Sequence, residues 1–149
     1  MADAKKPWAG RFQEATAASV ERFTSSLHYD RRLYRHDIEG SIAHATMLAD
    51  SGIISRKDAK AIIRGLKSIQ TDMEKGRFVF DPADEDIHMA IEKELIRRAG
   101  DAGAKLHTAR SRNDQIALDV RLYLREEVDG LIRLLTELQK QLVGMAKKE

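Results

Sequence analysis

The sequence predicts an all-α protein in which a small N-terminal helical domain is followed by the first long helix of a central helical bundle. Three observations support this fold class. The 149 residues include only two prolines, polar and apolar residues rarely alternate as they do in strands, and apolar residues recur every three or four positions. We expect an N-terminal arm over residues 1–18, a helical domain over 19–110, and the truncated start of the bundle domain over 111–149.

The arm is small and polar and has no helical periodicity. Trp8 and Phe12 are its large apolar side chains, and we expect them to hold the arm against the body of the protein. Ser19 is of a type that caps helix N-termini, so it predicts a short helix that continues to Phe23.

Two longer helices are predicted next. Apolar residues at helical spacing indicate a helix over residues 31–50, and Gly52 stands where a left-handed residue would end it. Ser55 followed by Asp58 resembles a capping box with a shorter acid, and it opens a second amphipathic helix. Gly76 is the expected end of that helix.

The run "DPADEDIHMAIEKEL" predicts a further helix. Asp81 is a favourable N-cap, Pro82 suits the first helical position, and the acids at 84–86 would then interact favourably with the positive end of the helix dipole. This helix is expected to stop near Gly100.

The last segment carries apolar residues at the rhythm of a coiled coil or bundle. They are Ile116, Val120, Leu124, Val128, Leu131, Leu135, Leu138, Leu142 and Met145. An unbroken helix from Ser111 to Lys147 would be roughly 55 Å long, whereas a globule of this size is only about 38 Å across. The helix should therefore protrude and need a partner, either another copy of the chain or more of a longer protein.

The run "KLHTARSRNDQ", residues 105–115, concentrates polar groups at the start of that long helix. Ser111 is a good N-cap with Asp114 at the third helical position, and a helix N-terminus favours anions. Arg110 and Arg112 add fork-shaped donors suited to carboxylate or phosphate. The neutral donors are Thr108, Ser111 and Asn113. The run predicts either a site for a polyanionic small molecule or a capped helix whose arginines pair with surface acids, and the residues alone leave both open.

Two other runs carry candidate groups. In "DEDIHMA", the acids before His88 would favour its imidazolium form, as a charged donor or an orienting group, whereas the simpler interpretation is a surface histidine. In "TSSLHYD", Ser26 stands between helices without a Ser-His-Asp order or a nucleophile elbow. Its hydroxyl would more often form a turn or a cap.

Composition and the absence of certain motifs argue against several classes of protein. The net charge of +2 is too small to indicate a nucleic-acid partner, and no stretch is apolar enough to predict a membrane span or a signal peptide. There is no cysteine, no P-loop and no histidine spacing typical of a metal site. We expect a cytoplasmic protein that binds neither nucleic acid nor membrane.

Four blocks resemble one enzyme family. "KPWAGRF", "SSLHYDRRLYRHDIEGSIAHATML", "DEDIHMAIEKEL" and "KLHTARSRNDQIALDVRLYLR" are similar to the N-terminal region of argininosuccinate lyases, members of the fumarase/aspartase superfamily and close relatives of δ-crystallin. The blocks keep the family's order and spacing and span nearly the whole chain. "HTARSRNDQ" and "DEDIH" are its most specific motifs.

The resemblance implies the reversible cleavage of argininosuccinate into arginine and fumarate by β-elimination, without cofactor or metal. It also implies a homotetramer in which three subunits assemble each site. Ser26 and Asn113 match the family's substrate-binding serine and asparagine. Further motif positions that line or support the substrate site are Thr108, Ser111, Arg112 and His88.

The chain departs from the family in lacking its catalytic motifs. Neither the Thr-His pair of a "GYTHLQ"-like segment nor a "GSSxMPxKxNP" loop occurs, so catalytic residues are expected beyond residue 149. We therefore expect substrate binding but little or no activity from these residues alone, unless a complementing C-terminal segment is present. The competing hypothesis is a non-enzymatic helical module for oligomerisation or a crystallin-like structural role. A basic RNA-binding helix is a weaker one, which lacks aromatic stacking platforms.

Overall fold

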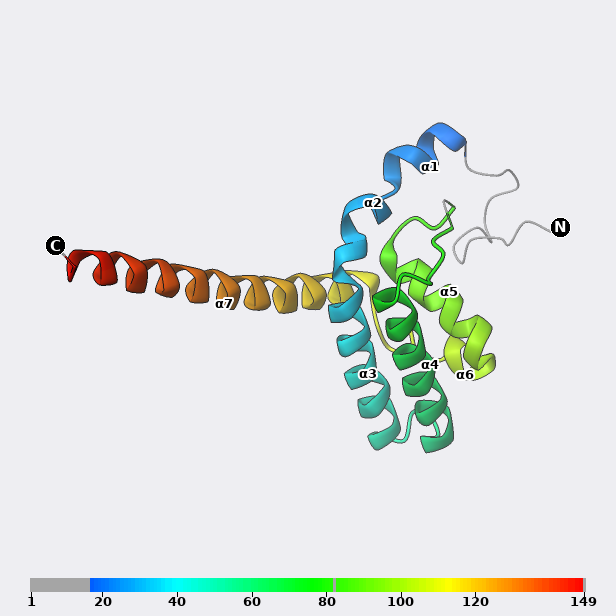
Figure 1. The fold of residues 1–149 in the computed structure, drawn as a ribbon. Helices are drawn as coiled ribbons and strands as arrows, with labels where there is room; N and C mark the ends of the chain where they lie inside the picture. Colours follow the sequence, from blue (N-terminus) through cyan, green and yellow to red (C-terminus); the bar gives the residue numbers. More distant parts are fainter. Residues whose placement is uncertain (1–16, 82, 149) are drawn as a thin grey trace.

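The computed structural model describes residues 17–81 and 83–148, and over these residues it is all-α, as predicted, with no strand (Figure 1). The elements are α1 (Ala18–Thr24), α2 (Leu27–Asp30), the 3₁₀ turn η2 (Arg31–Leu33), α3 (Tyr34–Asp50), α4 (Arg56–Glu74), α5 (Ile87–Ala99), α6 (Asp101–Ala104) and α7 (Arg112–Ala146). Trp8 and Phe12, the expected anchors of the arm, lie outside the described residues.

The core lies between α3, α4 and α5, which Figure 1 shows packed beside one another. Its fully buried aliphatic side chains are Ile38, Leu48, Ile62, Leu66, Ile69, Ile87, Ile91 and Leu95. These positions recur at helical spacing on each helix, so each helix contributes one apolar stripe. The short helix α6 folds back against α5 and covers one end of this core.

The local signals for the α3–α4 hairpin are confirmed. Gly52 and Gly76 are both left-handed, and each follows the end of a helix as expected. The Ser55 hydroxyl accepts a hydrogen bond from the backbone N–H of Asp58 at 3.0 Å and so caps α4. These predictions succeed because each depends on residues only a few positions apart.

The predicted cap of the first helix is wrong. α1 begins at Ala18, its N-cap is Ala17, and no side chain caps it. Ser19 therefore lies inside the helix rather than at its start. At the other end of α1, the Thr24 hydroxyl donates a hydrogen bond to the carbonyl of Val20 at 3.1 Å.

The predicted start of α5 is also wrong, because the chain forms a turn where the helix was expected. The Asp81 carboxylate accepts from the backbone N–H of Ala83 at 2.9 Å, a contact typical of an Asx turn. The helix begins only at Ile87, where the Asp86 carboxylate accepts from the N–H of Met89 at 2.6 Å. The acidic run therefore precedes α5, and His88 is the second residue of α5.

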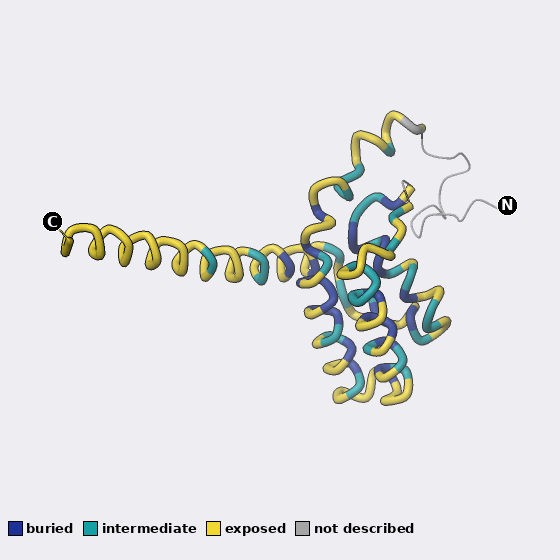
Figure 2. Tube along the Cα trace, in the orientation of Figure 1, coloured by how far each residue is buried: buried dark blue, intermediate teal, exposed yellow. Residues whose placement is uncertain are grey.

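The long helix α7 protrudes from the body, as its predicted length required (Figure 1). Its N-terminus carries the predicted capping box of Ser111 and Asp114. Only Gln115 and Asp119 are fully buried on it, and Figure 2 shows its outer part exposed throughout. In the described part of the chain, no helix has the length and apolar character needed to cross a membrane.

Gly103 provides a test of the α5–α6 packing. A Cβ at this position would lie 2.8 Å from the carbonyl oxygen of Leu95 and 2.9 Å from the Cα of Ile96, both backbone atoms that cannot rotate away. We expect Gly103→Ala to lower the free energy of unfolding by about 1–3 kcal/mol, as overpacking does. Urea denaturation followed by circular dichroism measures the change.

Gly144 in α7 is the matched control, since a Cβ there meets nothing within 4 Å. Gly144→Ala should be neutral or stabilising by up to about 1 kcal/mol, because alanine is the better helix former. Equal stability of the two variants would contradict the close contact between α5 and α6.

Candidate functional site

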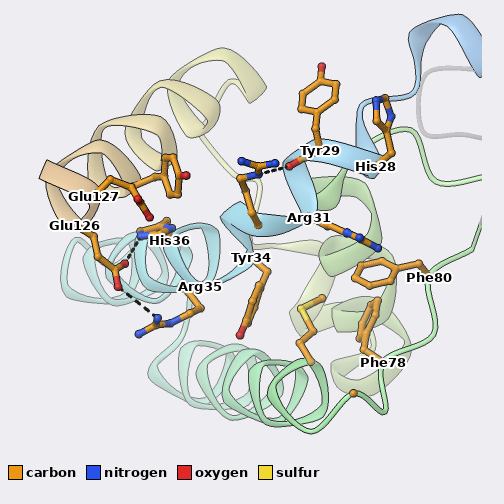
Figure 3. Close-up of a pocket in the computed structure, with 14 residues that line it drawn as sticks. His28, Tyr29, Arg31, Tyr34, Arg35, His36, Phe78, Phe80, Glu126 and Glu127 are labelled. Carbon is orange, nitrogen blue, oxygen red and sulfur yellow. Dashed lines mark hydrogen bonds and ion pairs between the residues drawn. The ribbon is translucent and has the colours of Figure 1, made fainter. Parts of the chain in front are cut away.

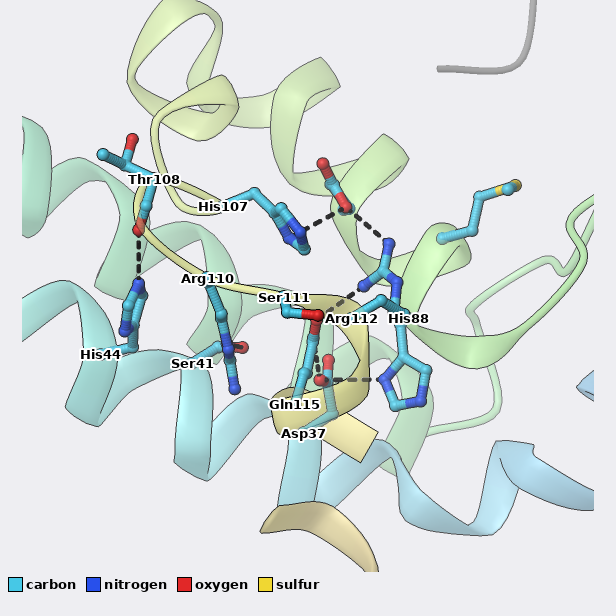
Figure 4. Close-up of polar contacts among 12 residues, drawn as sticks. Asp37, Ser41, His44, His88, His107, Thr108, Arg110, Ser111, Arg112 and Gln115 are labelled. Carbon is cyan, nitrogen blue, oxygen red and sulfur yellow. Dashed lines mark hydrogen bonds and ion pairs between the residues drawn. The ribbon is translucent and has the colours of Figure 1, made fainter. Parts of the chain in front are cut away.

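The candidate site is built over a buried polar network where α3, α5 and α7 meet (Figure 4). Asp37 of α3 is its centre. The carboxylate oxygen Oδ1 of Asp37 lies 3.1 Å from Nδ1 of His88 on α5, and it accepts a short hydrogen bond from the Gln115 side-chain amide on α7. Asp119, one turn further along α7, places Oδ2 3.4 Å from the same His88 nitrogen. All four side chains are buried.

Burial sets the charges of this network. Burial, reinforced by the neighbouring charge of Asp37, raises the pKa of Asp119 to about 8, so this carboxyl group is neutral at pH 7. Burial alone would also raise the pKa of Asp37, but hydrogen bonds from His88 and Gln115 outweigh it and lower that pKa. The network therefore holds one carboxylate and one carboxylic acid.

His88 is the basic partner in this network. Burial would lower its pKa, but the hydrogen bond and the charge of Asp37 raise it above the ordinary value. The interpretation of His88 as a surface histidine is therefore wrong, because the side chain is only 2% exposed. The interpretation as a charged group beside acids is the better one, although the partners are Asp37 and Asp119 rather than the preceding acidic run alone.

The loop between α6 and α7 is anchored beside this network by two contacts with α3. Nε2 of His44 lies 2.9 Å from the carbonyl oxygen of Thr108, and the buried Arg110 guanidinium donates to the Ser41 hydroxyl at 3.1 Å. Between them, Ala109 has a φ of 54°, a left-handed conformation that disfavours residues with a Cβ. A strained residue fixed by neighbours on each side is a feature that recurs at functional sites.

At the N-terminus of α7, some donor side chains are hydrogen-bonded within the protein and others are not. The Arg112 guanidinium donates to Glu92 at 2.9 Å and to the Gln115 side chain at 2.7 Å, yet its side chain remains 30% exposed. Ser111 forms the cap. Asn113 and Thr108 are exposed, and their side chains make no hydrogen bond to any residue that the structure describes.

Ser26 lies apart from this loop, at the start of α2. Its half-buried hydroxyl donates to Asp30 at 2.5 Å, and its backbone N–H donates to the carbonyl of Glu85 at 2.8 Å. Asp30 in turn accepts from the N–H of Ile87. Ser26 therefore ties α2 to the acidic approach to α5.

Among the residues that the structure describes, the six predicted for the substrate site do not line one cavity. A small cavity of about 10 Å³, enough for one water molecule at most, lies between Asp37, Ser41, His88, Arg110 and Gln115. Of the six, only His88 lines it. The free groups on Thr108 and Asn113 face outward instead, so a ligand held there would need further walls.

Sequence reasoning missed Asp37, Gln115, Asp119 and Glu92. The spacing of Gln115 and Asp119 could have indicated a polar contact face, because residues one turn apart share a face of the helix. The ligand atoms of Asp37, His88 and Asp119 also lie within 4.8 Å of one another, a spacing that a metal ion could bridge.

Comparison with known proteins places the chain in a family. A family model described as "Lyase" matches residues 10–149, nearly the full chain. The protein therefore belongs to this lyase family, whose all-α character agrees with the fold.

The curated relatives are more specific. The chain is 64% identical over 144 residues to an argininosuccinate lyase of Syntrophus aciditrophicus, 55% identical to that of Saccharophagus degradans, and 52% identical over 149 residues to that of Methylococcus capsulatus. The matches cover 97%, 97% and 100% of this chain but only 30%, 31% and 32% of the relatives. The predicted resemblance is confirmed, and the chain spans about a third of the relatives' length.

Asp119 gives the site a testable pH dependence. The folded protein keeps a proton on Asp119 up to about pH 8, whereas the unfolded chain releases it near pH 4. This contribution to stability is therefore complete at low pH and is lost as the pH rises toward 8. Asn cannot ionise, so the Asp119→Asn variant should not lose this stability as the pH rises. The free energy of unfolding of Asp119→Asn minus that of the wild type should therefore increase between pH 5 and pH 9. Urea denaturation at pH 5, 7 and 9 measures the difference.

The control is Asp129→Asn, on the exposed part of α7. The difference in free energy of unfolding between Asp129→Asn and the wild type should stay nearly constant across the same pH range. A pH-independent difference for Asp119→Asn would show that Asp119 is ionised in the folded protein.

Proposed function

We propose that this chain contributes substrate-binding groups to an active site that cleaves argininosuccinate reversibly into arginine and fumarate. The observation that supports this most directly is the N-terminus of α7. There a capped helix end, the exposed Asn113 amide, the exposed Thr108 hydroxyl and the partly exposed Arg112 lie within a few residues of one another on an anchored loop. The similarity to argininosuccinate lyases supplies the substrate.

The chemistry fits this arrangement. In the proposed β-elimination, a base removes a proton next to a carboxylate and a carbanionic intermediate forms before the C–N bond breaks. The extra negative charge settles on that carboxylate. Donors fixed in advance at a helix N-terminus stabilise such charge without having to reorganise. Neither a cofactor nor a metal takes part in the proposed reaction.

The predicted residues divide into two groups within this proposal. Thr108, Arg112 and Asn113 offer donors to the substrate carboxylates, and Ser26 binds from a second element. Ser111 and His88 act indirectly, because Ser111 is used in the cap and His88 is buried. His88 contacts Asp37 of α3 and Asp119 of α7, and thereby helps to hold α5 against both helices.

The proton-transfer groups and the remaining walls are proposed to come from outside these residues. The family's Thr-His and "GSSxMPxKxNP" motifs are absent from the 149 residues. We infer that a complementing C-terminal segment supplies the proton-transfer groups. Further copies of the chain, as in a tetramer, would add walls of the site along the exposed apolar side chains of α7. The proposal includes the cytoplasmic location expected from the sequence. A purely structural module is not favoured, because the relatives are named as enzymes.

Complementation tests the function. The chain is mixed with a polypeptide that carries the two missing motifs, argininosuccinate is added, and fumarate is followed by its absorbance. We expect activity from the mixture and none from the chain alone. Asn113→Ala should lower the rate of the mixture by about 10²-fold, the usual effect of removing a donor to a developing oxyanion.

Gln139→Ala, on the exposed outer part of α7, is the control and should leave the rate unchanged. Turnover by the chain alone would contradict the assignment of catalysis to other residues. Equal rates for Asn113→Ala and the control would contradict the substrate role of Asn113.

The assembly face can be tested separately. Leu135 and Leu138 are more than half exposed on the apolar side of α7. We expect the double variant Leu135→Gln with Leu138→Gln to shift sedimentation equilibrium toward the monomer, since it removes apolar area that association would bury. The matched double variant Arg133→Gln with Glu137→Gln should leave the association unchanged. The same mass for both variants would exclude this face from the interface.

A further inference from the structure

A second and larger cavity lies on another side of α3. It encloses about 620 Å³ between the α2–η2 turn, the end of α4, the segment 77–81 and α7 (Figure 3). None of the six residues predicted for the substrate site lines it. Its volume falls within the range of about 300–1,000 Å³ that is usual for small-molecule sites.

One part of this cavity is apolar and aromatic. Phe78 and Phe80 are half-buried, and their ring centroids are 4.9 Å apart. Tyr34 and Met73 continue the surface from α3 and α4. These side chains pack against the main core, so the aromatic wall is held in place rather than free in solvent.

The basic run "RRLYR" supplies the charged part. Arg32 donates to the carbonyl of Tyr29 at 2.9 Å, and Arg35 reaches Glu126 at 3.4 Å. The Arg31 side chain makes no hydrogen bond or ion pair with any residue in the described ranges 17–81 and 83–148. Figure 3 shows Arg31 on the same side of the cavity as Phe78 and Phe80. An arginine without a partner beside aromatic rings provides both a charge and a stacking surface.

The opposite wall limits the kind of anion. Glu126 and Glu127 of α7 line it, and Figure 3 shows them on the far side from Arg31. Nε2 of the buried His36 lies 2.8 Å from Glu126, while its Nδ1 is buried without a partner among the described residues. Carboxylates on this wall would repel an extended polyanion such as a nucleic acid. A small ligand with one anionic end avoids this repulsion.

We propose that this cavity binds a small organic anion with a planar aromatic body. The anionic group pairs with Arg31, and the ring packs against Phe78 and Phe80. The site is separate from the proposed lyase function and does not depend on it. It also assigns a role to the basic run, which the lyase function leaves unused.

Nuclear magnetic resonance of the isotopically labelled full chain tests the proposal. Phenyl phosphate and benzoate are the probes, and they distinguish a phosphate from a carboxylate as the anionic group. Benzamide carries the ring without the charge, and inorganic phosphate carries the charge without the ring. We expect saturable shifts of the Arg31, Phe78 and Phe80 resonances with at least one aryl anion and only weak shifts with the two partial probes.

Two pairs of variants make the test specific. Arg31→Gln should weaken binding by about tenfold, as the loss of a charged hydrogen bond does, whereas Arg64→Gln removes an exposed arginine of α4 and should change nothing. Phe80→Leu should also weaken binding, with the exposed Phe23→Leu as its control. The spectra of the variants show directly whether each is folded.

Three results would overturn the proposal. The first is the absence of saturable shifts with either aryl anion. The second is equal binding of benzamide, which would show that Arg31 is not used. The third is an equal loss of affinity in Arg31→Gln and Arg64→Gln, which would indicate a general charge effect. Unchanged lyase complementation in Arg31→Gln would confirm that the two sites are separate.

Discussion

The contact on which the described structure most depends is the pair of hydrogen bonds that the buried Asp37 carboxylate accepts from His88 and Gln115. It joins α3, α5 and α7, which come from three separate parts of the sequence. A buried carboxylate is tolerated only when partners replace the water it has lost, and removing one partner leaves an uncompensated charge. Charge pairing and hydrogen bonding therefore help to fix the geometry of α7 relative to α3 and α5, while Tyr123 of α7 packs against the core.

This anchoring explains how a loop on the surface can hold donors in fixed positions. Arg110 points inward to Ser41, His44 bonds the carbonyl of Thr108, and Ala109 between them is held in a left-handed conformation. The outward groups of Thr108 and Asn113 are thus mounted on a backbone that the buried network restrains. A site that stabilises developing negative charge benefits from such restraint, because donors that need not reorganise act more strongly.

The sequence predicted what local chemistry determines. The caps at Ser55 and Ser111 and the helix ends before Gly52 and Gly76 depend on neighbouring residues, and each was predicted correctly. The start of α5 was not, because Asp81 and Asp86 are both good caps and only the tertiary structure selects between them. The burial of His88 was missed for a related reason. Its partner Asp37 is 51 residues away, and no local pattern links the two.

The two faces of α7 show why its partner surface is apolar. Gln115, Asp119 and Glu126 are spaced by four and seven residues, so they lie along one side of the helix, and all three contact residues of α3 or α5. The apolar stripe that begins at Ile116 and Val120 lies one residue further round, and it is exposed. The helix therefore contacts α3 and α5 through these polar side chains, with Tyr123 packed against the core, and its apolar stripe stays exposed. A protruding helix with this division joins two surfaces of different chemistry.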